Sequence, residues 1–324
     1  MRLSRERLLE TAGTTGFRPE VLEKAIQLLH LLQSLQEHPD LQGKLALKGG
    51  TALNLFHFDV PRLSIDIDLN YIGAVERDAM VADRPVVERA IQAVCSREGF
   101  AVTRVPEEHA GGKWRLRYDS AYGQEANLEL DVNFMFRVPL WPVVAVDSHP
   151  VGPYRAMGIP VVDTHELAAG KLAALFSRNQ ARDLFDSHEM LARGHLERER
   201  LRIAFVVFGG MNRRDWRTVS LKDIDFEERG LAAQLVPTLR TGTISADETI
   251  LNFGRRLVNE CRERLSVLLP FTNRETRFLD RLLDEGVVDA SLLTDNSELR
   301  ERIEQHPLLA WKAENVREHK IEGR

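Results

Sequence analysis

Residues 47–56 read Leu-Lys-Gly-Gly-Thr-Ala-Leu-Asn-Leu-Phe, and residues 62–69 read Arg-Leu-Ser-Ile-Asp-Ile-Asp-Leu. From residue 63 to residue 71 apolar side chains alternate with polar ones, which predicts a strand with one apolar and one polar face. The glycine pair ends a short apolar run at 45–48 and precedes a predicted helix start at 51–58. These two segments therefore place a glycine turn next to a strand that carries two aspartates.

The glycine and aspartate pairs have the residue types that a phosphoryl-transfer site needs. Gly49 and Gly50 allow the backbone to approach phosphate oxygens, the following helix start directs N–H groups at them, and Thr51 adds a hydroxyl. Asp66 and Asp68 are two residues apart on a strand, so their carboxylates leave the same face and can bind Mg²⁺. Two such ions can activate an attacking hydroxyl and stabilise leaving pyrophosphate.

A third carboxylate in such a site has to come from a neighbouring strand. Asp131 lies on the polar face of a predicted strand at 126–134 and is the candidate, with Glu129 as the reserve. Ordinary alternatives exist for each feature. A glycine pair occurs in many turns, an aspartate pair can be a solvated strand face or a glycosyltransferase metal site, and Asp131 can be a surface residue of an edge strand.

The two segments quoted above resemble the AbiEii/AbiGii toxin family. Its members are nucleotidyltransferase-like toxins of bacterial toxin–antitoxin and phage-defence systems, related to the MenT toxins, within the DNA polymerase β-like superfamily. The gap between glycines and aspartates is longer than in the general superfamily pattern and suits this family in particular. The resemblance implies an NTP site and a two-metal Mg²⁺ site at Asp66, Asp68 and Asp131. It assigns to the nucleotide the residues Lys48, Gly49, Gly50, Thr51, Ser64 and Lys171.

A second group of charged residues resembles the family's later active-site element. Lys171 lies in an alanine-rich predicted helix, and Arg178, Arg182, Asp183 and Asp186 follow it. The resemblance implies that Lys171 contacts the triphosphate and that Asp186 orients Lys171 or acts as a base toward the acceptor hydroxyl. Arg182 and Asp183 would hold the two helices together. The alternatives are a surface lysine on an amphipathic helix, and capping or ion pairs that involve Asp183 and Asp186.

A mixed α/β half precedes an α-helical half in the predicted order of elements. We expect a nucleotidyltransferase-type mixed sheet with helices over residues 1–158, and an α-helical C-terminal domain over 159–324 that contributes to the active-site cleft. The predicted strands are 45–48, 63–71, 113–118 and 126–134. The predicted helices are 19–37, 84–98, 164–177, 181–193, 198–210, 224–238, 246–268 and 273–285. Five prolines between residues 139 and 160 indicate a connector between the halves.

Composition excludes several classes of protein. The 324 residues are 43% hydrophobic and 29% charged, which is ordinary for a folded chain, and the formal net charge of -5 does not indicate a nucleic-acid binder. A local basic face such as Lys113, Arg115 and Arg117 could still follow an RNA backbone, although a solvated strand face is the commoner explanation. Two distant cysteines exclude a disulfide framework. The charged N-terminus and the short apolar runs predict a cytoplasmic chain without a membrane span.

The combined prediction is a Mg²⁺-dependent nucleotidyltransferase toxin. The resemblance implies transfer of NMP from an NTP to the 3′ end of tRNA, which blocks translation, and a cognate antitoxin encoded next to the toxin. Two alternatives stay open. One is a nucleotide-binding regulatory or interaction protein without turnover, and the other is transfer to a protein or small-molecule hydroxyl. No motif selects which NTP is used.

Overall fold

The computed structural model describes residues 3–106, 108 and 110–322. Contacts divide the chain into two compact units. The first unit contains the chain up to Arg137 together with Val143–Val162 and Val236–Ala246. The second contains Val138–Pro142, Asp163–Leu235 and the chain from Asp247 onward. The domain boundary predicted between residues 158 and 159 stays a prediction.

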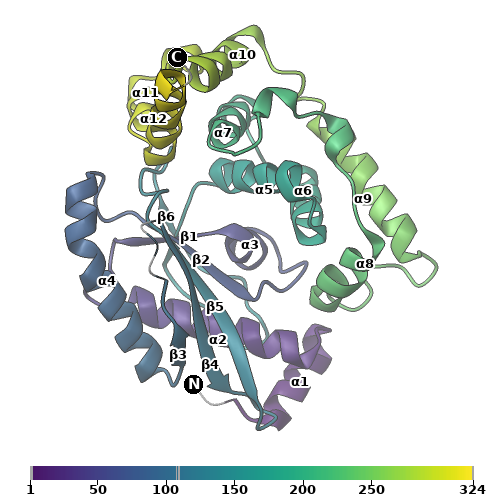
Figure 1. The fold of residues 1–324 in the computed structure, drawn as a ribbon. Coiled ribbons are helices and arrows are strands. Elements are labelled where there is room, and N and C mark those ends of the chain that lie inside the picture. The colour runs from purple at the N-terminus through teal and green to yellow at the C-terminus, as the bar shows by residue number, and fades with distance from the viewer. Residues whose placement is uncertain (1–2, 107, 109, 323–324) are drawn as a thin grey trace. The chain divides into compact units, whose positions relative to one another are not determined.

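A mixed sheet of seven strands forms the centre of the first unit, in the order β3-β4-β5-β2-β1-β7-β6 (Figure 1). Its strands are β1 (Leu45–Lys48), β2 (Asp66–Tyr71), β3 (Ala101–Arg104), β4 (Gly111–Asp119), β5 (Glu125–Asn133), β6 (Val144–Val146) and β7 (Ile159–Val161). The pairs β2–β5 and β1–β7 are parallel, and the other neighbours are antiparallel. The predicted mixed α/β class is therefore confirmed.

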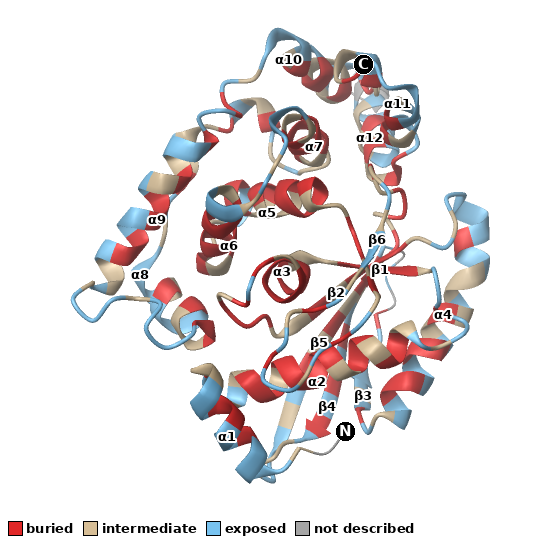
Figure 2. Ribbon diagram, turned by 180° about the vertical axis from the view of Figure 1, so that it is seen from behind, coloured by how far each residue is buried: buried red, intermediate tan, exposed pale blue. Residues whose placement is uncertain are grey.

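Long helices cover the apolar face of this sheet. The helices of the first unit are α1 (Arg5–Thr15), α2 (Pro19–Gln36), α3 (Gly49–Thr51), the π-helical turn η1 (Ala52–His57) and α4 (Arg77–Arg97). Helix α2 starts at a proline and is buried over most of its length (Figure 2). Its Leu32 and Leu35 meet Leu47 and Leu69 of the strands. Burial of each such leucine contributes about 1.5–3 kcal/mol.

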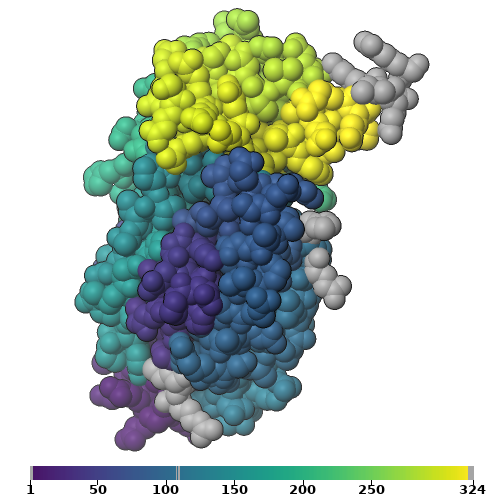
Figure 3. Space-filling view, turned by 90° about the vertical axis from the view of Figure 1, so that its left-hand side faces the viewer, coloured from purple at the N-terminus to yellow at the C-terminus, as the bar shows by residue number. Residues whose placement is uncertain are grey.

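Hydrogen bonds tie α2 and α4 to each other and to the sheet. Glu98, directly after α4, accepts from His30 Nε2 at 2.7 Å and from Ser34 Oγ at 3.0 Å, both on α2. Asp83 of α4 accepts a 2.7 Å hydrogen bond from Tyr71 of β2. The outer side of α4 lies at the surface of this unit in the space-filling view (Figure 3). With α2 and α4 on the apolar side, the polar side chains of β2 and β5 point to the opposite face of the sheet.

The second unit consists of helices over its described residues. They are α5 (Thr164–Arg178), α6 (Ala181–Arg193), α7 (Arg198–Gly210), α8 (Glu228–Gly230), α9 (Ile250–Leu265), α10 (Asn273–Asp280), α11 (Ser297–Glu304) and α12 (Pro307–Glu322). Short 3₁₀ or π turns are η2 (Trp216–Thr218), η3 (Leu221–Asp223), η4 (Leu231–Leu235), η6 (Arg281–Glu285) and η7 (Ala290–Leu292). An aromatic cluster of Phe176, Phe205 and Trp216 lies in its core, with ring centroids 5.2–5.8 Å apart. No helix among the described residues could cross a membrane.

The structure differs from the predicted elements where contacts between distant segments determine the backbone conformation. The strand predicted at 63–71 begins only at Asp66, because Leu63 N donates to Thr238 O and Arg62 bridges to Leu239 instead. The helix predicted at 224–238 is broken into α8, η4 and the 3₁₀ turn η5 (Val236–Thr238), and Thr238 at its end is the acceptor of the hydrogen bond from Leu63. The proline-rich connector holds β6 and β7, and β3 was not predicted.

Candidate active site

The glycine turn lies directly against the first unit's aspartates. Strand β1 ends at Lys48 and passes without a loop into α3. Gly49 has a φ of +75°, and a Cβ there would lie 2.2 Å from Asp68 Oδ2. Because only glycine fits such a position, the backbone of the turn approaches the Asp68 carboxylate more closely than any other residue would allow. Gly50 is buried, and its carbonyl oxygen accepts a 2.9 Å hydrogen bond from Asn54 Nδ2.

The hydroxyl of Thr51 is used within the fold. Thr51 is fully buried, and its Oγ1 donates to the carbonyl oxygen of Asp66 at the start of β2. The threonine therefore joins the glycine turn to the aspartate strand. Ser64, two residues before β2, is also buried, with 4% of its surface exposed. Lys48 ends β1 with its Nζ 5.3 Å from the centre of the Phe136 ring, a distance at which a cation–π interaction forms.

Three carboxylates share one face of neighbouring strands. Asp66 and Asp68 alternate with buried Ile67 on β2, so both point to the polar face. Asp68 lies opposite Asp131 of the parallel strand β5, and on its other side it lies opposite Lys48 of β1. Neighbouring strands are about 4.8 Å apart, so the strand order brings these carboxylates within reach of one ligand.

Electrostatics distinguish Asp131 from its reserve, Glu129. Burial raises the pKa of Asp131, Lys48 opposes this rise, and the Asp68 carboxylate adds to it. A hydrogen bond from Lys113 Nζ, 2.7 Å long, lowers the pKa of Glu129. Glu129 is thus already hydrogen-bonded to a cation, whereas the pKa of Asp131 stays raised despite Lys48 and Lys113, and a bound cation would favour its ionised form.

The carboxylate pair fits a magnesium site that is completed by substrate. The described residues contain no group of three or more His, Cys, Asp or Glu side chains already gathered for a metal. Protein-bound Mg²⁺ commonly uses one or two carboxylates together with substrate phosphates and water. Asp66 and Asp68, i and i+2 on a strand and next to a glycine turn, have that donor set.

Lys171 in the second unit is a mostly buried cation between two fully buried carboxylates. Its Nζ lies 2.8 Å from Asp186 Oδ2 and 3.2 Å from Asp183 Oδ1, which joins α5 to α6. The side chains of Lys171, Asp183 and Asp186 are 13%, 2% and 0% exposed. Arg178 Nε also donates to Asp183 at 2.7 Å. The surface-lysine alternative is therefore wrong, while the ion pair between Asp183 and Arg178 is present.

These contacts bear on the roles expected for the acidic residues of α6. Asp186 touches Lys171 and has no exposed surface, which favours orientation of the lysine over the role of a base toward an acceptor. Asp183 receives hydrogen bonds from Lys171 and Arg178, both on α5, and so holds the two helices together. Sequence reasoning missed the pairing of Lys113 with Glu129 and the ring of Phe136 under Lys48, because both depend on strand order.

Comparison with known proteins identifies a family and a fold. Residues 30–249 match the profile of the family described as "Nucleotidyl transferase AbiEii toxin, Type IV TA system". The fold is similar to that of MenT4, a nucleotidyltransferase toxin from Mycobacterium tuberculosis, with a TM-score of 0.59 and 18% sequence identity. The match covers 93% of this chain and 98% of that chain. No curated protein sequence matches the chain.

Proposed function

Because this chain belongs to the AbiEii family of nucleotidyltransferase toxins from type IV toxin–antitoxin systems, we propose that it transfers NMP from an NTP to RNA, with the 3′ end of tRNA as acceptor. The resemblance read from residues 47–69 is thus confirmed at the level of the family. Modification of that end prevents aminoacylation and thereby stops translation. The reaction needs NTP and tRNA, so we propose that the protein acts in the cytoplasm.

One observation carries the proposal. The Asp68 carboxylate lies between a glycine turn that admits no Cβ and a second carboxylate, Asp131, on the next strand. Backbone N–H groups next to paired aspartates favour binding of a triphosphate together with its metal. An apolar or purely structural role would explain neither the close approach of Gly49 nor the unfavourable carboxylate neighbours.

In the proposed reaction the acceptor hydroxyl oxygen bonds to the α-phosphorus, the bond from that phosphorus to pyrophosphate breaks, and the hydroxyl proton is released. Gly49 and Gly50 bind phosphate oxygens through the backbone, Lys48 directly precedes them, and Ser64 lies two residues before Asp66. Asp66 and Asp68, with Asp131, would hold two Mg²⁺ ions. Bound Mg²⁺ would stabilise negative charge on the phosphates and lower the pKa of the attacking hydroxyl.

The role of Lys171 rests on the family resemblance and on its burial. We assign it to the triphosphate, with Asp186 as the residue that orients its ammonium group. A lysine held by two carboxylates keeps one defined position, and this reduces the entropy that it loses on binding a ligand. Arginine in place of Lys171 would keep the positive charge but spread it over a planar guanidinium group. We therefore expect the KM for NTP to rise in Lys171→Arg.

A labelling experiment tests the proposal. The purified chain is incubated with MgCl₂, bulk tRNA and each α-³²P-labelled NTP in turn, and label on RNA is measured after gel electrophoresis. We expect labelling with at least one nucleotide, loss of labelling with EDTA, and loss in Asp66→Asn. Asp78→Asn is the matched control because Asp78 is a 97% exposed carboxylate on α4, and its labelling should equal that of the unaltered chain.

Different results would reject different parts of the proposal. Absence of label on tRNA with all four nucleotides, while label appears on a protein or small molecule, would overturn the RNA acceptor. Absence of any transfer, with nucleotide binding unchanged in Asp66→Asn and Asp68→Asn, would favour a binding protein without turnover. Growth arrest that is prevented by co-expression of the neighbouring gene would support a cognate antitoxin encoded next to the toxin.

A further inference from the structure

Four basic side chains line the outer part of the sheet on the face that carries the aspartates. They are Arg104 of β3 and Lys113, Arg115 and Arg117 of β4, and together they form what we call the basic strip. All four are exposed, and on β4 they alternate with buried Trp114 and Leu116. From the sequence, Lys113, Arg115 and Arg117 could either follow an RNA backbone or form a solvated strand face, and Arg104 was not included with them.

The strand register connects the basic strip to the candidate site. Arg104 lies opposite Arg115, which lies opposite Glu129, which lies opposite Asp66. In the next row Lys113 lies opposite Asp131 and Asp131 opposite Asp68. Since cross-strand partners point to the same face and strands are about 4.8 Å apart, Arg115 lies two strands, or about 10 Å, from Asp66.

The strip contains a cross-strand pair of like charges. Arg104 and Arg115 are cross-strand partners beside a β-bulge, and like charges placed opposite each other destabilise a sheet. Within the described part of the chain no carboxylate lies within ion-pair distance of Arg104. Arg115 has a contact of only 4.0 Å, to Glu129. An anion bound between the two guanidinium groups would remove the repulsion.

The acidic partners of the remaining two residues do not prevent binding of an anion. Lys113 pairs with Glu129 at 2.7 Å and Arg117 with Glu125 at 3.2 Å. The lysine and arginine side chains are 59% and 46% exposed. Exposed ion pairs of this kind contribute about 0–1 kcal/mol, so a phosphate can compete for these cations. The glutamates hold the basic side chains in place over the strand.

We propose that the basic strip binds the phosphate backbone of the acceptor RNA upstream of its 3′ end. This inference rests on the proposed function, because it assumes that the reacting end lies at Asp66 and Asp68. Side chains i and i+2 on a strand are about 7 Å apart, so β4 presents cations at a regular interval in a line. A nucleic acid is a polymer with regularly spaced phosphates, and it supplies the matching charges.

The neighbours of the strip favour RNA over a protein partner. On the same face, Ala101 lies opposite Arg117 on β3, and Asn127 lies opposite Arg117 on β5. Neither residue offers the large apolar or aromatic anchor that the centre of a protein interface usually contains. Contacts to phosphate need only cations and hydrogen-bond donors.

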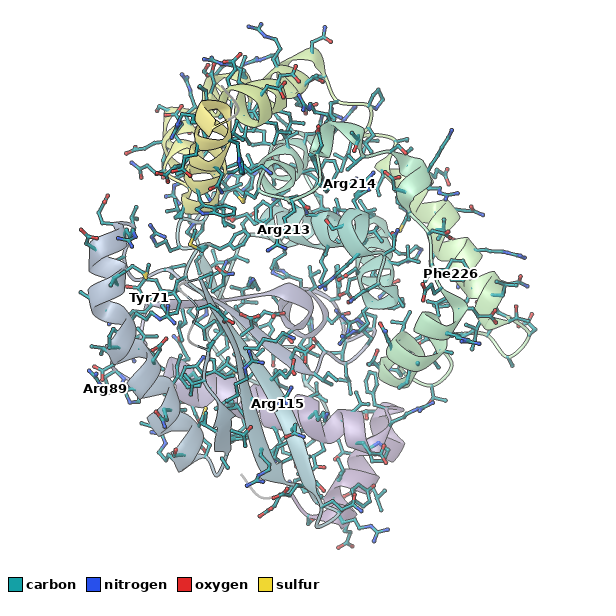
Figure 4. The ribbon with its side chains drawn as sticks, in the orientation of Figure 1. Tyr71, Arg89, Arg115, Arg213, Arg214 and Phe226 are labelled. Carbon is teal, nitrogen blue, oxygen red and sulfur yellow. The ribbon has the colours of Figure 1, made fainter. Side chains whose placement is uncertain are left out.

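The test compares two double-charge removals that differ only in place. One variant carries Arg104→Ala and Arg115→Ala in the strip. The control carries Arg77→Ala and Arg89→Ala on α4, where both arginines are exposed, and Figure 4 shows Arg89 on α4 and Arg115 on the sheet. Affinity for 5′-fluorescein-labelled bulk tRNA is measured by anisotropy from 50 to 300 mM KCl in the full chain, without Mg²⁺ or NTP. KM values for tRNA and NTP are measured separately by labelling.

We expect the strip variant to bind tRNA about 10-fold more weakly and to show a slope of log K against log salt that is shallower by about 1.4, at about 0.7 for each of two lost phosphate contacts. Its KM for tRNA should rise by a similar factor at unchanged KM for NTP. The control should behave as the unaltered chain. Thermal unfolding checks folding, and removal of the Arg104–Arg115 repulsion should not lower Tm.

The inference and the proposed function fail in different ways. If the strip variant transfers NMP to tRNA with unchanged KM and salt slope, the strip is not the RNA site, while the proposed function stands. If tRNA binding depends on the strip but no nucleotide is transferred, the proposed function fails and the binding surface stands. Unchanged tRNA binding with lost binding of the purified antitoxin would assign the strip to a protein and overturn the inference.

Discussion

Asp68 on β2 lies directly opposite Asp131 on the parallel strand β5. Two carboxylates in this arrangement repel each other, and burial together with Asp68 raises the pKa of Asp131. The next row of the same ladder pairs Asp66 with Glu129, but there Lys113 neutralises the glutamate. Lys48 and Lys113 flank the Asp68–Asp131 row, yet burial keeps the pKa of Asp131 raised, so the ionised carboxylate lowers stability, which is typical of a site kept for function.

Asp131→Asn should raise stability and remove activity. A raised pKa means that the folded chain binds this proton more tightly than the unfolded chain, so ionised Asp131 lowers stability as pH rises from about 4 through the raised pKa. In metal-free urea unfolding the variant should gain more at pH 7 than at pH 4. Transfer activity should fall by about 100-fold or more, since even residues behind a metal ligand change metal affinity by about 10–100-fold.

Glu129→Gln is the matched control, and its stability effect should have the opposite sign. The hydrogen bond from Lys113 lowers the pKa of Glu129, so the ionised carboxylate stabilises the fold above its ordinary pKa, and this contribution disappears as pH falls through the lowered value. The variant should therefore lose stability at pH 7 and keep more transfer activity than Asp131→Asn. Equal loss of activity in both variants would contradict the choice of Asp131 as the third metal ligand.

Gly49→Ala should reduce transfer by about 100-fold or more, whereas Gly43→Ala should preserve it. Both glycines have positive φ, +75° and +70°, and an L-residue there costs about 1–2 kcal/mol. A Cβ at Gly43 meets nothing within 4 Å, but at Gly49 it would displace the Asp68 carboxylate. Urea unfolding and labelling assays on both variants separate backbone strain from damage to the site. Similar activity losses would show that strain alone is responsible.

Local sequence patterns were sufficient to predict the shared face of Asp66 and Asp68 and the bounds of several helices. The alternation around Asp66 and Asp68 is local, so it predicts that both point to one face, as they do. The helices predicted at 181–193 and 198–210 coincide with α6 and α7, because their apolar residues repeat with helical spacing. The strand prediction was wrong for residues 63–65, because Leu63 is hydrogen-bonded to the distant residue Thr238 and the strand begins only at Asp66.

Features that depend on non-local pairing could not be predicted. Alternation shows which face Asp131 occupies, but strand order decides that β5 lies beside β2. The three-residue strands β6 and β7 are too short for a periodic signal. Likewise, helical spacing does not show that Lys171 meets Asp183 and Asp186, since that contact depends on how α5 packs on α6.

Lys171→Met should destabilise the chain by about 3 kcal/mol, because removal of one partner from a buried ion pair leaves the charge of the other behind. The second substitution Asp186→Asn, added to Lys171→Met, should restore part of this loss. Lys222→Met removes an exposed lysine of the same unit and should change the free energy of unfolding by less than about 0.5 kcal/mol. Urea unfolding of the unaltered chain, Lys171→Met, Asp186→Asn and the double variant gives the coupling energy, and a value near zero would contradict a buried pair.

His188 should make stability depend on pH above neutrality. It is buried on α6, with Nε2 2.7 Å from Glu260 of α9 and Nδ1 3.2 Å from Glu189. Burial lowers the pKa of His188, but the hydrogen bonds to Glu189 and Glu260 outweigh that effect and raise the pKa above its ordinary value. The imidazolium form donates from both nitrogens, whereas the neutral ring carries one N–H and keeps only one of these bonds as donor.

The sign of the effect follows from the raised pKa. The stabilisation by His188 is fully present below the unfolded value of about 6.5 and is lost as pH rises through the folded pKa. His188→Gln should therefore cost more free energy of unfolding at pH 6 than at pH 9, measured with urea at fixed ionic strength. His195→Gln, at an exposed histidine of the same unit, should show no such difference. A cost for His188→Gln that is the same at both pH values would mean that protonation of His188 does not stabilise the fold, and that the imidazolium does not bridge α6 and α9.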